Sequence, residues 1–367
     1  MGMCQMDILV LGGTGAIGKP LIKHLAQKKE NKIRVTTRRV REIKDDNVSY
    51  IQGDARDNSF LETLLSVKVD ILIDFMSYKT DELQCRLDMI LKNVDQYIFI
   101  SSARVYANSS IKLTEKSERL LDNSSDMSFL STDEYALAKA RQENLLIESS
   151  YKNWTIVRPY ITYGDERLQL GIFEKEQWLY RVLNQRTIVF SKDLLQTRTT
   201  LTHGEDVSFL ISCLVANVKA KGEVYQIASD VDITWGEVLN IYTDTYAEVK
   251  GYAPSVYLLE TMDQLKPAIR NYYHFLYDRA YNRSFNSSKI NTIIGEDYEY
   301  IKAEVGLKKC LTNFLLSSDL NFQNIDWKME AYMNRITKEH MNIGCFDNKQ
   351  KVKYIIGRYT PYLEKNK

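Results

Sequence analysis

The residues that build metal centres and disulfide frameworks are scarce in this sequence. It contains five cysteines and four histidines among 367 residues. The cysteines are scattered and form no Cys-x-x-Cys pair; they occupy Cys4, Cys85, Cys213, Cys310 and Cys345. This spacing argues against a disulfide framework or a zinc site, so we expect no bound metal and a reducing environment.

An excess of one charge and long apolar runs are also missing. Lys and Arg number 49 against 48 Asp and Glu, which leaves a net charge of +1. Such a balance gives no indication of a nucleic-acid partner or of an anionic membrane surface. No apolar run approaches the roughly 18 residues that a membrane-spanning helix needs. The first residues lack the layout of a secretory signal peptide, so we predict a cytoplasmic protein without membrane association.

The first half of the sequence alternates β-rich runs with stretches whose apolar residues recur at helical spacing. The near-continuous apolar character of the runs predicts a parallel sheet that helices cover on both faces. The expected strands are residues 7–13, 33–39, 48–54, 69–76, 97–102 and 154–164. The expected helices are residues 19–29, 59–67, 82–94 and 133–149.

A glycine-rich stretch follows the first expected strand directly. In LVLGGTGAIGKPLIKHL, Gly12, Gly15 and Gly18 lie between that strand and the next helix. Glycine lets the backbone turn tightly and approach a pyrophosphate, whose charge the free N–H groups of a helix N-terminus favour. Glycine triplets also occur at such turns for steric reasons alone. The position within the first strand–helix–strand unit nevertheless predicts a dinucleotide site.

These features define the expected fold as an α/β protein with a Rossmann-type doubly wound parallel sheet and a smaller C-terminal α/β substrate domain. The regular alternation stops near residue 165. We therefore expect an NAD(P)-binding domain at 1–165 to which 200–230 returns, a substrate-binding domain at 166–300, and a helical extension of unassigned role at 301–367.

The end of the second strand bears on the choice of dinucleotide. It reads Thr37-Arg38-Arg39, with Arg38 twenty residues after Gly18. An acidic residue there would bind a ribose 2′-hydroxyl, whereas arginine suits a 2′-phosphate. We therefore favour NADP(H). NAD(H) is the alternative, in which Arg38 is simply an exposed residue at the end of a strand.

A tyrosine and a lysine lie four residues apart on one expected helix. EYALAKA places Tyr135 and Lys139 on the same face. The ammonium there favours the phenolate and so lowers the pKa of the tyrosine. Such a tyrosine can exchange a proton with a carbinol or carbonyl oxygen while a nicotinamide exchanges hydride with the adjoining carbon. Together with the glycine loop and Ser101-Ser102 at the end of the fifth strand, the pair predicts a dehydrogenase.

These motifs occur in the order found in a known family. The chain resembles an extended short-chain dehydrogenase/reductase of the NAD-dependent epimerase/dehydratase family, whose members act on nucleotide-linked sugars. The resemblance covers residues 6–295 and rests on GGTGAIG (12–18), Ser101-Ser102 with Val105-Tyr106, Tyr135 with Lys139, RPYITYG (158–164) and HGEDV (203–207). It implies the fold stated above, a nucleotide-sugar substrate and a homodimer.

The resemblance also implies roles for individual residues. Ser102 would hydrogen-bond the reacting oxygen, Tyr135 would be the general acid/base, and Lys139 would also hold the nicotinamide ribose. The implied cofactor contacts are Gly12, Thr14, Gly15, Ala16, Ile17, Gly18, Thr37, Arg38, Arg39, Asp54, Ala55, Phe75, Met76, Tyr135, Lys139, Pro159 and Ile161. The candidate substrate contacts are Ser102, Arg104, Tyr163, Arg198 and Arg279.

Two of these arginines, Arg198 and Arg279, are candidates for the sugar-nucleotide diphosphate, because a guanidinium presents a fork of donors to phosphate oxygens. Arg198 lies one position off the usual register of the family. Tyr163 suits a wall of the substrate pocket or packing at a strand end equally well.

The residues after Ser102 limit which reactions of the family are possible. The 4,6-dehydratases of the family have Asp-Glu there, whereas this chain has Ala103 and Arg104, and its Asp133-Glu134 pair lies on another element. The resemblance then leaves 4-keto reduction, alcohol oxidation and 4-epimerisation. We favour a nucleotide-sugar 4-ketoreductase, with a 4-epimerase that holds NAD tightly as the alternative. Retention of both Tyr135 and Lys139 argues against a third class, the non-catalytic redox sensors and RNA-associated proteins of this fold.

Overall fold

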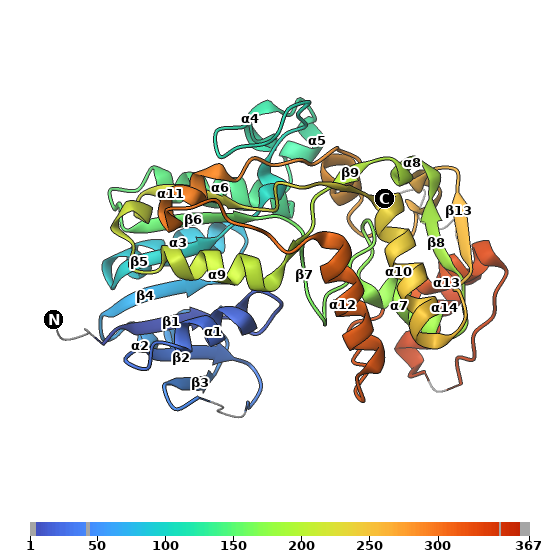
Figure 1. Cartoon of the computed structure of the whole chain (residues 1–367), viewed down its shortest axis with the longest axis horizontal. Coiled ribbons are helices and arrows are strands. Elements are labelled where there is room, and N and C mark those ends of the chain that lie inside the picture. Colours follow the sequence, from blue (N-terminus) through green and yellow to red (C-terminus); the bar gives the residue numbers. More distant parts are fainter. Residues whose placement is uncertain (1–4, 42–44, 345, 360–367) are drawn as a thin grey trace. The chain divides into compact units, whose positions relative to one another are not determined.

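The chain divides into two compact units in the computed structural model, which describes residues 5–41, 45–344 and 346–359 (Figure 1). Within the described residues, unit 1 comprises Met1–Thr162, Thr200–Asp232 and Arg283–Ile301. Unit 2 comprises Tyr163–Thr199, Ile233–Asn282 and Lys302–Lys367. Each unit is therefore assembled from three separate segments of the sequence.

A seven-stranded, entirely parallel sheet forms the centre of unit 1, as the apolar runs predict. Its order is β11-β6-β5-β4-β1-β2-β3. The strands are β1 (Asp7–Leu11), β2 (Lys32–Thr37), β3 (Val48–Gln52), β4 (Val69–Asp74), β5 (Val94–Ile100), β6 (Trp154–Pro159) and β11 (Glu223–Ile227). The order reverses between β1 and β4, and open sheets of this kind bind ligands outside the carboxyl ends of the strands at such a reversal.

Helices cover both faces of this sheet, so it is doubly wound. Ile8 and Val10 of β1 pack in one apolar cluster, whereas Leu9 and Leu11 pack in another. All four side chains are fully buried, which is why the strand is apolar throughout residues 8–11. Helices of the first face are α1 (Gly18–Ala26), α9 (Gly204–Leu214) and α11 (Ser288–Ile294). Those of the second are α2 (Asn58–Leu64), α3 (Thr80–Lys92) and α6 (Tyr135–Ile147).

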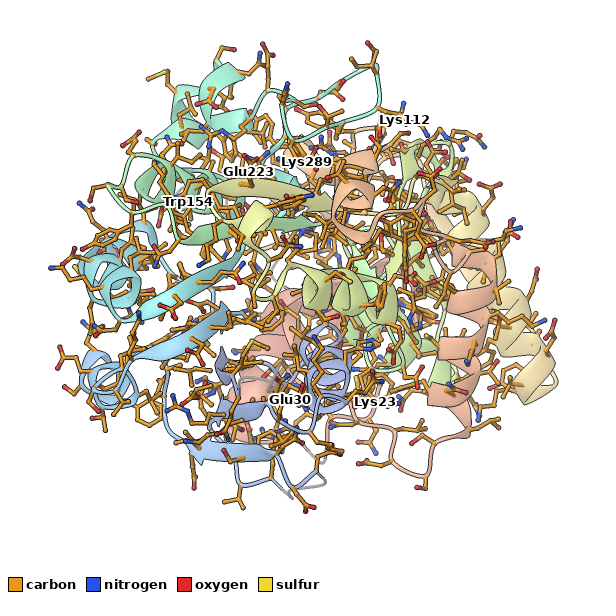
Figure 2. All side chains as sticks on the ribbon, turned by 60° about the vertical axis from the view of Figure 1, so that its left-hand side comes forward. Lys23, Glu30, Lys112, Trp154, Glu223 and Lys289 are labelled. Carbon is orange, nitrogen blue, oxygen red and sulfur yellow. The ribbon has the colours of Figure 1, made fainter. Side chains whose placement is uncertain are left out.

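The last segment of unit 1 lies along β11, at the edge of the sheet. The ammonium of Lys289, on α11, donates to Glu223 Oε2 at 2.7 Å and to the Val224 carbonyl at 2.8 Å. Figure 2 shows Lys289 and Glu223 close together. Ile290 of the same helix is fully buried in the apolar cluster of the first face. These contacts attach residues 283–301 to unit 1.

The boundaries predicted from sequence therefore need correction. Residues 283–300, expected in the smaller domain, and residue 301, expected at the start of the extension, belong to unit 1. The described residues 302–344 and 346–359, expected in a separate extension, belong to unit 2. Helical periodicity shows which face of a helix is buried but not which core it joins. Residues 200–232 lie in unit 1.

Unit 2 is mainly helical. Its helices are α7 (Lys175–Leu183), α8 (Lys192–Leu195), α10 (Trp235–Lys250), α12 (Ala303–Leu316), α13 (Trp327–Thr337) and α14 (Asn348–Tyr359). Its short strands are β8 (Ile188–Ser191), β9 (Arg198–Thr199), β12 (Ile233–Thr234) and β13 (Val256–Leu259). The other α-helices and strands of the described residues are α4 (Leu120–Asn123), α5 (Met127–Leu130), β7 (Thr162–Tyr163) and β10 (Thr202–His203).

A buried arginine attaches the C-terminal segment to α7. Arg181 is fully buried, and its guanidinium donates to Glu330 at 2.8 Å, Asn334 at 2.7 Å and Glu339 at 2.7 Å. Glu339 also accepts from the Thr187 N–H at 2.8 Å. A guanidinium that is shielded from solvent needs such acceptors, because an unpaired buried charge destabilises the folded state. The C-terminal helices thus complete the interior of unit 2.

We expect Glu339→Gln to destabilise the protein by about 1–2 kcal/mol, since it weakens charge-assisted hydrogen bonds. Burial alone raises the pKa of Glu339, but hydrogen bonds from Thr187 and Thr337 outweigh it and lower the pKa from the ordinary 4.5. Its stabilising contribution is therefore present above pH 4.5 and is lost as the pH falls through the lower folded pKa.

Chemical denaturation at pH 7 and at pH 3.5 checks this prediction, because the difference between variant and wild type should shrink at the lower pH. Glu248→Gln is the control, since Glu248 forms an exposed pair with Lys308 and is expected to change stability by less than about 0.5 kcal/mol. Equal losses at both pH values would contradict the role assigned to the carboxylate.

Candidate active site

The glycine loop after β1 has the close backbone packing that a pyrophosphate cradle requires. Gly12 has a φ of +73°, and a Cβ there would lie 2.8 Å from the sulfur of Met76. A Cβ on Gly18 would lie 2.4 Å from the Gly13 carbonyl carbon. Gly15 has open space around it. Side chains are therefore excluded where the loop turns and where α1 begins, which fits a loop that brings backbone N–H groups to a ligand.

A cavity of about 210 Å³ lies beside this loop, at the ends of β1, β2 and β3. Seven residues of the predicted cofactor set line it: Gly12, Thr14, Thr37, Arg38, Asp54, Ala55 and Met76. Thr36, Gly53 and Arg56 complete the lining. Arg56 was not among the predicted cofactor residues, although it follows Asp54 by two residues. Its guanidinium donates to the Ser77 carbonyl at 3.0 Å, and its N–H donates to Asp54 Oδ1 at 3.0 Å.

The other predicted cofactor residues lie elsewhere in unit 1. Ala16 and Ile17 are in the loop that leads into α1, and Arg39 is exposed after β2. Phe75 packs against the apolar cluster of the first face. Pro159 ends β6, and the Ile161 carbonyl accepts the Thr202 N–H at 2.9 Å. The structure leaves their role in cofactor binding as a prediction.

The predicted catalytic residues meet where β5 ends and α6 begins. Ser102 follows β5 and is 7% exposed, whereas Tyr135 is the first residue of α6 and is 36% exposed. Lys139, one helical turn later, is 2% exposed. Its ammonium donates to the Ile100 carbonyl at 2.8 Å and to the Met76 carbonyl at 3.4 Å. The lysine thus joins α6 to the ends of both β4 and β5.

Burial lowers the pKa of the Lys139 ammonium to about 8, although Asp74 and Glu143 favour its charge. Asp74 ends β4 and is fully buried. It accepts hydrogen bonds from Tyr97 Oη at 2.9 Å and from the Met76 N–H at 2.9 Å. Burial raises the pKa of Asp74, whereas these donors and Lys139 act in the opposite direction. Asp74 thereby fixes the turn that carries Met76, a role that the sequence analysis missed.

Arg104 connects Ser102 to the start of α6. Its backbone N–H donates to Ser102 Oγ at 3.2 Å, and its guanidinium donates to Glu134 Oε1 at 2.7 Å. The guanidinium carbon lies 5.1 Å from the centre of the Tyr135 ring. Glu134 caps α6, because its Oε2 accepts the Ala136 N–H at 2.6 Å. Its carboxylate is therefore engaged on both oxygens.

A fully buried carboxylate, Glu143 of α6, supports this corner of the site. Ser101 Oγ donates to it at 2.6 Å, and Arg158 of β6 donates to both of its oxygens at 2.9 and 2.7 Å. Arg119 adds a longer contact at 3.4 Å. Burial opposes the charge of Arg158, but Glu143 outweighs it and the pKa of Arg158 is raised. Ser101 therefore holds the strand end, whereas Ser102 Oγ accepts the Arg104 N–H.

The candidate substrate residues beyond position 162 lie in unit 2. Tyr163 is fully buried, and a Cβ on Gly306 of α12 would lie 1.9 Å from its oxygen. Arg279 is 3% exposed and donates to the Gly171 carbonyl at 3.0 Å and to Asp278. Arg198 is exposed on β9. These environments favour Arg198 over Arg279 as the anion-binding candidate, and both assignments stay predictions.

None of the helices in the described residues has the length and apolar character that crossing a membrane requires. Residues 5–41, 45–344 and 346–359 contain no group of three or more His, Cys, Asp or Glu side chains placed to hold a metal ion.

Comparison with known proteins identifies relatives of this fold. The chain is 27% identical over 247 residues to the chloroplast stem-loop binding protein of 41 kDa b of Arabidopsis thaliana. That alignment covers 63% of this chain and 61% of the relative, so the chain spans less than two thirds of the length of this relative.

Solved structures of the same fold include two epimerases. The UDP-N-acetylglucosamine 4-epimerase from Methanobrevibacter ruminantium M1, in complex with UDP-N-acetylmuramic acid, superposes with a TM-score of 0.64 at 16% identity, over 85% of this chain and 99% of that one. The UDP-glucuronic acid 4-epimerase from Bacillus cereus, in complex with NAD, gives 0.63 at 16% identity, over 86% and 98%.

The model of the NAD dependent epimerase/dehydratase family matches residues 8–228, more than half of the 367 residues. The match contains the glycine loop, Ser102, Tyr135 and Lys139, and it confirms the resemblance predicted from those motifs. The chain therefore belongs to the NAD dependent epimerase/dehydratase family.

Proposed function

We propose that the protein is an NAD(P)-dependent oxidoreductase that acts on a nucleotide-diphosphate sugar, with 4-keto reduction as its reaction. The observation that carries this proposal is the grouping of Ser102, Tyr135 and Lys139 at the junction of β5 and α6. The glycine loop and its cavity support a dinucleotide in the same unit. Membership of the family supports the sugar-nucleotide substrate.

When bound, the dinucleotide supplies or accepts the hydride. Tyr135, a partly exposed residue, gives a proton from its Oη to the substrate oxygen as that oxygen becomes an alkoxide. Ser102 Oγ donates a hydrogen bond to the same oxygen and stabilises its developing charge. The Lys139 ammonium favours the phenolate that remains on Tyr135. The reverse direction uses the same groups, with Tyr135 as the base.

The surroundings of Ser102 favour hydride chemistry over elimination of water. Ala103 is fully buried and has no carboxylate, and the Arg104 guanidinium is bound to Glu134. Glu134 itself serves as cap and ion-pair partner. No carboxylate on Ala103–Val105 is therefore available as an acid or a base, which leaves reduction, oxidation or epimerisation at C4.

Identification of the dinucleotide separates the reductase from the 4-epimerase. The purified protein is denatured and any released dinucleotide identified, and NADPH and NADH are then titrated into the dinucleotide-free protein. Consumption of NADPH with a UDP-4-keto sugar supports reduction. The 4-epimerase would instead be established by three results together: tightly bound NAD, no binding of NADPH, and interconversion of UDP-glucuronic acid with its 4-epimer.

The two arginines of the cavity favour NADP(H). We expect Arg38→Ala to weaken NADPH binding about tenfold, since a lost charge-assisted contact to phosphate costs roughly 1.4 kcal/mol or more. NADH binding should change little, because NADH lacks the 2′-phosphate. Fluorescence titration of both nucleotides measures this difference. Arg41→Ala is the matched control, since Arg41 is exposed and outside the cavity lining. Equal weakening of NADPH and NADH would overturn the assignment.

The plant relative suggests a second candidate function. That relative is named as a stem-loop binding protein, and the chain is 27% identical to it over 247 residues. Binding to stem-loop RNA is tested by a filter assay at several salt concentrations, because contacts to phosphates weaken steeply with salt. The net charge of +1 favours the oxidoreductase. Salt-sensitive submicromolar RNA binding without NADPH or NAD binding would favour the second candidate.

A further inference from the structure

Arg104 is placed to act on Tyr135 rather than on a substrate. Its side chain is 15% exposed and forms an ion pair with Glu134, whose side chain is 4% exposed. The two groups lie 2.7 Å apart, and the guanidinium carbon is 5.1 Å from the centre of the Tyr135 ring. A cation over an aromatic face is attracted to it, more strongly where water is excluded.

Three contacts fix this guanidinium relative to the ring. The arginine lies on the short helical segment Ala103–Val105, whose first turn is tied to Ser102 Oγ through the Arg104 N–H. Glu134 holds the guanidinium, and the same carboxylate caps α6 through Ala136. Because Tyr135 is the first residue of α6, the cap that starts the helix also sets the distance between the arginine and the phenol.

The charges around Tyr135 come from several elements. Arg104 and Glu134 flank it, Lys139 follows on α6, and Asp74 of β4 lies near Lys139. The Glu134 charge is offset at the Ala136 N–H, where the positive end of the α6 dipole lies. The ammonium of Lys139 donates to the Ile100 and Met76 carbonyls. The guanidinium is thus held at a defined position over the phenol ring.

We propose that Arg104, held by Glu134, is a positioning residue for Tyr135: it orients the phenol ring and favours its phenolate form. This inference rests on the proposed role of Tyr135 and reassigns Arg104, which the sequence analysis placed among the substrate contacts. Arginine keeps its charge at every pH of interest, so its effect on the phenol persists where a lysine would lose its proton.

The test measures the pKa of Tyr135 directly in the full-length protein. Tyrosine labelled with carbon-13 at Cζ gives one NMR signal for each of the 24 tyrosines, and the spectrum of Tyr135→Phe identifies the signal of Tyr135. We expect Arg104→Gln to raise the Tyr135 pKa by about one unit, since a nearby opposite charge shifts a pKa by roughly 1–3 units. Arg104→Lys should restore at least half of that shift.

Two variants keep the test decisive. Arg141→Gln removes the same charge from α6, where the guanidinium binds the Thr132 carbonyl and Asp133, and it should leave the Tyr135 pKa within about 0.3 units. Glu134→Gln frees the guanidinium without removing it and should broaden or split the Tyr135 signal; this variant and Arg104→Lys carry the test if Arg104→Gln does not fold. An unchanged pKa in Arg104→Gln, or an equal shift in Arg141→Gln, would overturn the proposal.

The NMR measurement of the Tyr135 pKa does not depend on turnover. The proposed role of Tyr135 in catalysis and the proposed role of Arg104 can therefore be refuted separately. If Tyr135→Phe keeps full activity while Arg104→Gln shifts the Tyr135 pKa, the acid/base role proposed for Tyr135 is wrong, but the effect of Arg104 on the phenol stands. If Tyr135→Phe is inactive while the pKa ignores Arg104, the proposed function stands and the positioning role is wrong.

Discussion

Tyr135→Phe is expected to lower kcat by about 10²- to 10⁴-fold, the range that one general acid/base supplies. The substitution removes only a hydroxyl from a side chain that is 36% exposed, so the fold should be unaffected. Binding of NADPH should stay within about twofold of wild type, since the loss of one partly exposed hydroxyl changes binding by a few tenths of a kcal/mol. Steady-state turnover of a UDP-4-keto sugar and a fluorescence titration of NADPH measure the two quantities.

Tyr257→Phe is the control for this experiment, because Tyr257 is 45% exposed and lies in unit 2. It should leave both quantities unchanged. Wild-type turnover by Tyr135→Phe would remove the basis of the proposed mechanism. Loss of NADPH affinity without loss of kcat would instead make Tyr135 a cofactor contact.

The second large effect concerns stability. We expect Glu143→Gln to destabilise the protein by about 3–5 kcal/mol, the loss typical of breaking a buried ion pair by removing one partner. Glutamine preserves the shape of the side chain but leaves the buried Arg158 guanidinium, which is 3% exposed, without its counter-charge. Denaturation by guanidinium chloride, followed by circular dichroism, measures the change. Turnover should also fall, because Ser101, the residue before Ser102, donates a hydrogen bond to Glu143.

A double-mutant comparison shows whether the charge is the cause. Glu143→Met combined with Arg158→Met removes both charges of the buried pair, so it should be more stable than either single methionine variant. Glu148→Gln, at the exposed end of α6, should change stability by less than about 0.5 kcal/mol. A loss below 1 kcal/mol in Glu143→Gln would show that water or a rearranged neighbour satisfies Arg158.

The parts of the site that the sequence predicts are those defined by local spacing. Gly12 and Gly18 mark the cofactor loop because steric limits on the backbone act within a few residues. Tyr135 and Lys139 fall on one face because helical periodicity is local as well. The sheet follows from apolar runs whose residues are buried on both faces, as β1 shows.

The buried residues that hold the site in place, Glu143 and Asp74, were not predicted because their roles depend on contacts with residues distant in the sequence. Within ARQENLL, Glu143 resembles any polar residue of a helix; it is buried only because Arg158, fifteen residues away, and Ser101, forty-two residues away, bond to it. Asp74 likewise ends an apolar strand, and its partner Tyr97 comes from the next strand. The prediction that residues 283–300 belong to the smaller domain was wrong for the same reason, since β11 and α11 meet only in the folded chain.

The division of each unit into separate segments has a consequence during synthesis of the chain. β6 ends at Pro159, but its neighbour β11 starts at Glu223, 223 − 159 = 64 residues later. At roughly 5–20 residues per second, a ribosome needs about 3–13 s to deliver that strand. Until then the nascent sheet carries an open parallel edge that can pair with another chain. Translation speed across residues 160–222, and chaperones that cover β6 meanwhile, therefore bear on the yield of folded protein.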